Sequence, residues 1–233
     1  MTLNETNAVK EILRLDKERN AAIRAPFNPI TGEGSILMRD RQVFEVKGFP
    51  IKMWLPKQMF KIPLIKKLLA AGSLSKFITD TLEEPDTEDS REAVIQSVVK
   101  LRCRYDFAFW AAFYAMIKPK GGGDDVLFRL SRPQRRLVER LEAKRLAGKP
   151  IRLILLKARQ WGGSTCIQLY MAWLQLCHKP GLNSLIVAHQ GTASDEIQDM
   201  FDRMIKAYPV GMLHKLGEAY KENEAKWVGR SEE

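Results

Sequence analysis

The sequence predicts an α/β fold, with a parallel sheet in a three-layer arrangement behind a mainly helical and irregular N-terminal region. Two apolar runs of strand length predict the sheet, at 151–156 (IRLILL) and at 183–188 (NSLIVA). Between them, residues 164–177 have the length and apolar content of a helix. A strand, a helix and a second strand in this order form a right-handed βαβ unit, and continuous apolar strands indicate a sheet covered on both faces.

Helices are also expected on both sides of this unit. Residues 93–118 repeat apolar side chains every three or four positions, which predicts one long core helix. Residues 131–147 predict another helix, because Ser131 suits its N-cap and Gly148 follows its end. A last helix is predicted over 193–208. The second half of the chain therefore alternates between strands and helices.

The first 82 residues form a basic N-terminal region whose role the sequence does not define. A polar helix is expected over 4–24, and a short helix broken at Gly72 is expected further on. The acidic segment 83–92 (EEPDTEDSRE) is predicted to be a linker, since it carries one arginine against six carboxylates. Residues 93–233 would then be the N-terminal portion of an ATPase domain, for the reasons that follow.

Composition favours a protein of the cytoplasm with an uneven basic charge. The chain has 233 residues and a net charge of +10. Residues 93–150 carry 13 Lys and Arg against 5 Asp and Glu, and such a surface suits either DNA or plain solvation. The longest apolar run, 107–117, is too short to span a bilayer, and no signal peptide is evident. The three cysteines form no metal-binding pattern and are expected to be reduced packing residues.

The segment 157–165 (KARQWGGST) connects the first predicted strand to the helix that follows. A phosphate-binding loop at such a junction usually reads GxxxxGK[ST], and its backbone N–H groups surround the phosphates. Gly162 takes the second glycine position, and Ser164 takes the hydroxyl position next to Mg²⁺. Lys157 replaces the first glycine and Gly163 replaces the usual lysine. The predicted phosphate-binding residues are Lys157, Ala158, Arg159, Gln160, Trp161, Gly162, Gly163, Ser164 and Thr165.

The cation that such a loop requires has to come from an unusual position. Lys157 or Arg159 could reach the β- and γ-phosphates from the start of the loop, and the sequence does not decide between them. Trp161 is expected to pack over the predicted sheet and not to stack on a base. The alternative is a simple turn between strand and helix that Ser164 caps, with no ligand.

The segment KARQWGGST resembles the deviant Walker A motif of the large subunit of tailed-phage terminases, the ATP-driven motors that package DNA. In that family, basic residues come early and an Arg-Gln pair precedes the glycine. The following segment 184–209 is also similar, so the resemblance covers about residues 125–210. It implies a partial P-loop NTPase fold, ATP and Mg²⁺ as cofactors, and packaging of double-stranded DNA into procapsids. The implied partners are DNA, a small terminase subunit, the portal and, in the full-length protein, further copies in a ring.

Gln134 lies about one helix upstream of the loop. Terminases and helicase-like motors carry a glutamine there that reads adenine, and a carboxamide suits this role because it donates and accepts together. The alternative is a capping box, in which Gln134 accepts from the backbone N–H of Ser131.

DNA contact and its coupling to the nucleotide are assigned to two further groups. Arg132, Arg136 and Arg140 fall on one helical face and could bind DNA phosphates, or they could form a solvated face paired with nearby glutamates. His189 and Gln190 follow the second predicted strand, in the loop that couples nucleotide to DNA in the family. The alternative for these two is a surface loop with no role.

Hydrolysis of ATP requires carboxylates that hold Mg²⁺ and orient water. In the motors that this chain resembles, they end a third apolar strand, and residues 208–233 contain no such pattern. The family's acidic nuclease residues are also missing. The sequence therefore predicts an inactive fragment with no catalytic residues that is truncated before the Walker B motif. Two alternatives remain, a fragment of a helicase-like P-loop ATPase and a non-enzymatic basic DNA-binding module.

Overall fold

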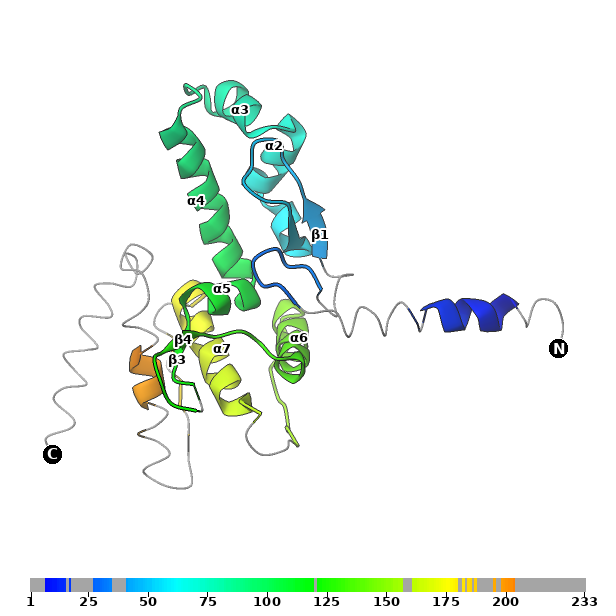
Figure 1. Cartoon of the computed structure of the whole chain (residues 1–233), viewed down its shortest axis with the longest axis vertical. Helices are drawn as coiled ribbons and strands as arrows, with labels where there is room; N and C mark the ends of the chain where they lie inside the picture. The colour runs from blue at the N-terminus through cyan, green and yellow to red at the C-terminus, as the bar shows by residue number, and fades with distance from the viewer. Residues whose placement is uncertain are drawn as a thin grey trace, which may run out of the picture. The chain divides into compact units, whose positions relative to one another are not determined.

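The computed structural model of the chain is mainly helical (Figure 1), and its described residues contain two small sheets. It describes residues 7–15, 17, 27–34, 41–119, 121–156, 161–179, 182, 184–185, 187, 195 and 198–203. The chain forms two compact units, Met1–Asp106 and Phe107–Glu233. None of the described helices is long and apolar enough to cross a bilayer.

The predicted α/β fold with a parallel sheet is wrong. Both sheets among the described residues are antiparallel pairs of short strands. Residues 151–156 form neither helix nor strand, and the side chains of Ile154 and Leu156 are fully exposed. Leu185, in the second predicted strand, is 85% exposed. An apolar run becomes a strand only where another strand supplies hydrogen bonds, and neither run has such a partner in the described part of the chain.

The first unit combines a hairpin with helices. Strands β1 (Arg41–Phe44) and β2 (Met53–Pro56) pair in antiparallel register, with Phe44 opposite Met53. The following elements, in chain order, are η2 (Lys57–Lys61), α2 (Pro63–Ala71), α3 (Leu74–Phe77), the π-helical turn η3 (Ile78–Leu82) and α4 (Glu88–Tyr105). Figure 1 shows α4 running along the side of this group, where Val94 and Val98 complete an apolar core.

Local signals set the helix boundaries in this unit. Gly72 adopts φ 72° at the end of α2, which confirms the predicted break, because glycine enters the left-handed region without steric cost. Thr87 caps α4 by accepting from the Ser90 N–H. The acidic segment 83–92 thus contains the start of α4.

The predicted single helix over 93–118 is two helices. Helix α4 ends at Tyr105, and α5 begins at Phe107. Between them Asp106 leaves the helical conformation, at φ −131° and ψ 88°. Asp106 is 3% exposed, and its carboxylate forms ion pairs with two arginines. These tertiary contacts break the helix, although the apolar periodicity of the sequence continues through this position.

This buried charge cluster consists of Arg41, Arg102 and Asp106. Arg41 donates two hydrogen bonds to Asp106, at 2.8 and 2.9 Å, and Arg102 Nε donates one at 3.2 Å. Arg102 also donates to the carbonyl oxygens of Pro29, at 2.9 Å, and of Ile30. The cluster thereby ties residues 27–34 to β1 and α4. Burial lowers the pKa of Arg102, while the Asp106 carboxylate opposes that shift.

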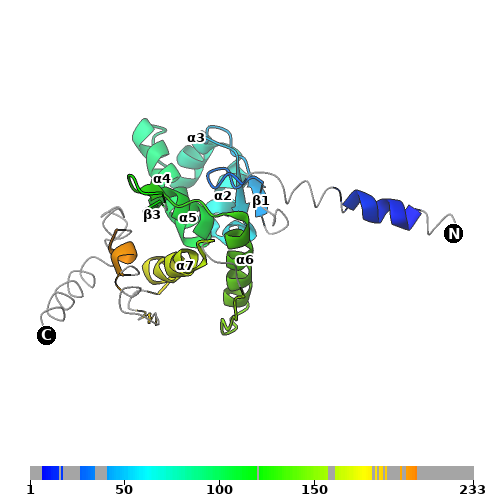
Figure 2. The same cartoon turned by 60° about the horizontal axis from the view of Figure 1, so that its bottom comes forward.

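Among its described residues, the second unit is mainly helical. Its elements, shown in Figures 1 and 2, are α5 (Phe107–Tyr114), β3 (Met116–Ile117), β4 (Val126–Leu127), α6 (Arg132–Leu146) and α7 (Gly163–Cys177). Phe107 of α5 packs on Tyr170 and Trp173 of α7, with ring centroids 5.5 Å apart in both pairs. The bounds of α6 and α7 confirm the helices predicted over 131–147 and 164–177.

Candidate functional site

Helix α7 begins without a capping side chain. Its N-cap is Gly162, in the left-handed region at φ 75°, and its first turn contains no acidic residue. The Gly162 carbonyl accepts the Cys166 N–H at 3.1 Å, which closes the first helical bond. The N–H groups before Cys166 have no partner inside the helix, and the helix dipole adds partial positive charge at this end.

The alternative of a turn capped by Ser164 does not match this geometry. Ser164 lies inside the first turn of α7 and is exposed, and the N-cap position belongs to Gly162. Thr165, the next residue, is half-buried. By contrast, Ser73 and Thr87 cap α3 and α4 with their side chains. The start of α7 is therefore built differently from these two helix starts.

Gln134 connects the starts of α6 and α7, and we call this set of hydrogen bonds the Gln134 bridge. Its Oε1 accepts from the Ser131 N–H at 2.7 Å. Its Nε2 donates to the Gly162 carbonyl at 2.9 Å and lies 3.3 Å from the Trp161 carbonyl. Gln134 is only 5% exposed. The structure thus forms the capping bond expected of Gln134 and also brings this residue to the predicted loop. The adenine role of Gln134 remains a prediction.

Two glycines at the loop end leave no room for side chains. A Cβ on Gly162 would lie 2.7 Å from Gln134 Nε2, and a Cβ on Gly163 would lie 2.7 Å from the Trp161 ring. Trp161 itself is half-buried. Its indole N–H is buried and has no hydrogen-bond partner in the part of the chain that the structure describes. A buried donor of this kind is costly unless an acceptor reaches it.

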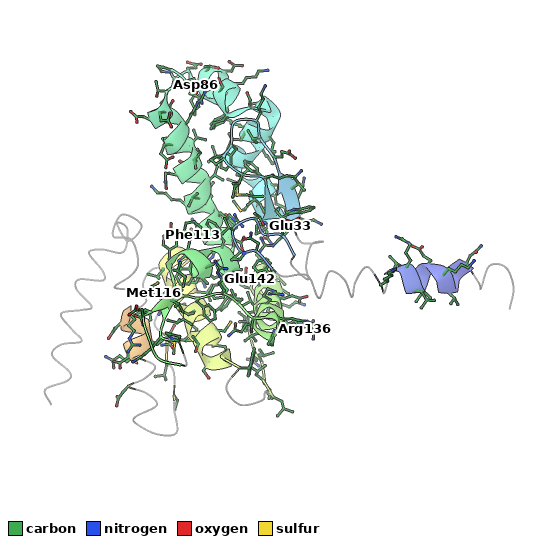
Figure 3. All side chains as sticks on the ribbon, viewed as in Figure 1. Glu33, Asp86, Phe113, Met116, Arg136 and Glu142 are labelled. Carbon is green, nitrogen blue, oxygen red and sulfur yellow. The ribbon has the colours of Figure 1, made fainter. Side chains whose placement is uncertain are left out.

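A second contact joins α6 to α7 further along both helices. Glu142 points from α6 toward α7 (Figure 3) and accepts from the Tyr170 hydroxyl at 2.5 Å. Arg145 donates two hydrogen bonds of 2.7 Å to Glu142, and its guanidinium lies 5.3 Å from the centroid of the Trp173 ring. Burial, followed by the nearby Glu142 carboxylate, raises the pKa of Tyr170. Sequence spacing gave no signal for this group, because Tyr170 lies 28 residues beyond Glu142.

The predicted DNA-contacting arginines share an exposed face of α6. Arg132, Arg136 and Arg140 are all exposed, and Arg136 points away from α7 in Figure 3. No ion pair engages these three among the described residues. Arg135, on another side of the helix, donates to the Leu130 carbonyl at 3.3 Å, and burial lowers its pKa.

Several predicted site residues lie outside the described residues. They are Lys157, Ala158, Arg159, Gln160, His189 and Gln190. Within the described ranges, no group of three or more His, Cys, Asp or Glu side chains could hold a metal ion. Cys166 is buried in the first turn of α7, and burial raises the pKa of its thiol to about 12. Its complete burial fits the packing role expected of this cysteine.

Comparisons of the chain with protein-family models, with curated proteins and with solved structures found no match.

Proposed function

We propose that the chain binds the triphosphate of ATP at the N-terminus of α7. One observation carries this proposal: α7 starts on two glycines, with no capping side chain and no carboxylate in its first turn. Such a terminus offers backbone N–H groups and positive dipole charge to an anion.

The residues around this terminus suit a nucleotide with Mg²⁺. The first-turn amides would bind phosphate oxygens, and the exposed Ser164 hydroxyl would face the Mg²⁺ ion. Lys157 or Arg159 would supply the cation that a phosphate loop requires. The buried Trp161 indole N–H would gain an acceptor from a bound anion.

We further propose that the chain is part of the ATPase of a DNA-packaging motor of the terminase large-subunit type. The KARQWGGST loop supports this assignment, as does the free arginine face of α6. These arginines recur every four residues, about 6 Å apart along the axis of α6, so their charges form a row that could face DNA phosphates. Turnover of ATP, ring formation, and contact with the small subunit and the portal would be functions of such a motor in the host-cell cytoplasm.

The nucleotide proposal predicts that the chain binds a fluorescent ATP analogue through its loop cations. Replacing both Lys157→Ala and Arg159→Ala should weaken binding at least about tenfold, because each charge-assisted hydrogen bond contributes about 1.5–3 kcal/mol. Fluorescence anisotropy at fixed Mg²⁺ measures the dissociation constant. Lys149→Ala, which removes an exposed cation outside the loop, is the matched control. A wild-type chain that does not bind, or a double variant that binds normally, contradicts the proposal.

The DNA proposal predicts a lower salt dependence when the arginine face is neutralised. The double variant Arg136→Ala and Arg140→Ala should bind duplex DNA of any sequence more weakly, and the slope of log K against log salt should fall by about one per arginine. The control removes two exposed lysines of α2, Lys66→Ala and Lys67→Ala. Equal slopes for the two double variants would assign the binding to net charge and not to α6.

A further inference from the structure

We propose that Gln134 is a positioning residue, which holds the first turn of α7 in place through its two carbonyl contacts and does not read the base. The Gln134 bridge is a property of the fold. Its effect on ligand binding rests on the proposed nucleotide function.

The first argument is the number of hydrogen bonds that a carboxamide can make. Gln134 has two N–H donors and an oxygen with two lone pairs. Its Nε2 faces the carbonyl oxygens of Gly162 and Trp161, at 2.9 and 3.3 Å, so both donors have partners. Its Oε1 accepts from the Ser131 N–H. Reading the edge of adenine requires one donor and one acceptor together, and Gln134 has no donor left while the bridge is intact.

The second argument is steric. Gln134 is 5% exposed, and its Nε2 lies so close to Gly162 that a Cβ there would approach within 2.7 Å. The carboxamide is therefore enclosed between the N-terminal turns of α6 and α7. A base could reach it only if the two helix starts moved apart.

The third argument concerns what the bridge holds. The Gly162 carbonyl accepts from both Gln134 Nε2 and the Cys166 N–H. Gln134 thereby fixes the peptide group at the N-cap of α7, and this group sets the direction of the N–H groups that follow it. The bridge spans 28 residues of sequence and joins the loop to the helix that carries the arginine face. We infer that the Gln134 bridge keeps the N–H groups of the first turn of α7 oriented toward a common point.

Hydrogen exchange of the full chain tests the bridge without any ligand. Gln134→Glu keeps the acceptor for the Ser131 N–H but turns the donor that faces two carbonyls into a second acceptor. We expect the Cys166 amide, which donates to the Gly162 carbonyl, to exchange about tenfold faster, while the Ser131 and Arg135 amides at the start of α6 stay protected. Gln175→Glu is the matched control, because Gln175 Nε2 donates to the Leu182 carbonyl at the other end of α7. Unchanged exchange of the Cys166 amide in Gln134→Glu overturns the proposal.

Ligand binding tests the positioning role. The neutral variant Gln134→Met should weaken ATP, GTP and inorganic tripolyphosphate by the same factor, about threefold to tenfold, since each ligand uses the same amides. A loss confined to ATP would show that Gln134 reads the base and would overturn the proposal. If the wild-type chain binds none of the three, the nucleotide function fails, and the exchange experiment alone decides whether the bridge holds α7.

Discussion

Replacing Asp106 with asparagine should destabilise the first unit by about 3–5 kcal/mol, the cost of breaking a buried ion pair by removing one partner. Asp106 is 3% exposed and faces two guanidinium groups, Arg41 and Arg102. Arg102 is 1% exposed and cannot turn to water without unpacking α4. Asparagine preserves the shape of the side chain but removes the negative charge that faces both guanidinium groups.

The effect should extend beyond α4, because the cluster joins three parts of the unit. Arg41 also donates to the Trp54 carbonyl of β2 at 3.0 Å, and Arg102 donates to the carbonyl of Pro29. Losing the carboxylate that orients both arginines should therefore release residues 27–34 and weaken the hairpin. Limited proteolysis between residues 27 and 34 should become faster in Asp106→Asn.

Urea unfolding measured by circular dichroism gives the change in free energy. Asp86→Asn is the matched control, since Asp86 also accepts two hydrogen bonds from one arginine, Arg91, each 2.7 Å long, but this pair is at the surface. Exposed ion pairs contribute little to stability, so this control should unfold close to the wild type. Similar midpoints for the two variants would mean that the Asp106 cluster is not a determinant of stability.

Helices whose ends are encoded locally could be predicted from the sequence. The N-cap position of Ser131 and the glycine at 148 defined α6, and Gly72 ended α2. These signals act within a few residues, through capping bonds and through the steric freedom of glycine. They do not depend on how distant segments pack. These helix boundaries were therefore predicted correctly, although the predicted fold class was wrong.

The sheet could not be predicted in this way, because strand pairing is non-local. The run IRLILL has the composition of a buried strand, yet Ile154 and Leu156 are fully exposed and lie in no strand. Composition records that a segment is apolar and says nothing about whether a partner lies beside it. The prediction of a parallel sheet from two apolar runs assumed that each run lies beside another strand.

The break at Asp106 had only a partial signal. An aspartate followed by the apolar run FAFWAAF is unusual, and Arg102 precedes it by one helical turn. This spacing is also found in ordinary surface pairs, which continue the helix. Asp106 differs from such a surface pair by its contact with Arg41, which lies 65 residues away in sequence.

The candidate site was predicted in part. The sequence placed a loop and a helix N-terminus at 157–165 and left Gln134 with two alternative roles. The capping bond to Ser131 was one of them. The contact with Gly162 was not foreseen, because the two residues are 28 positions apart and no motif links them.

Gly162→Ala should destabilise the second unit by about 2–3 kcal/mol, through two separable effects. At φ 75° an alanine is strained by about 1–2 kcal/mol. Its Cβ would also lie 2.7 Å from Gln134 Nε2, and the carboxamide can yield only by giving up its bonds to the two carbonyl groups. A lost hydrogen bond of this kind costs about 1 kcal/mol more.

Gly148→Ala separates these two effects. Gly148 has nearly the same backbone strain, at φ 65°, but a Cβ there meets nothing within 4 Å. Urea unfolding should therefore show only the strain of about 1–2 kcal/mol in Gly148→Ala. In a Gln134→Ala background, the cost of Gly162→Ala should fall to that same value, because the colliding group is gone. If Gly162→Ala instead keeps its full cost in that background, the glycine is required by the backbone alone, and the Gln134 bridge does not hold the start of α7.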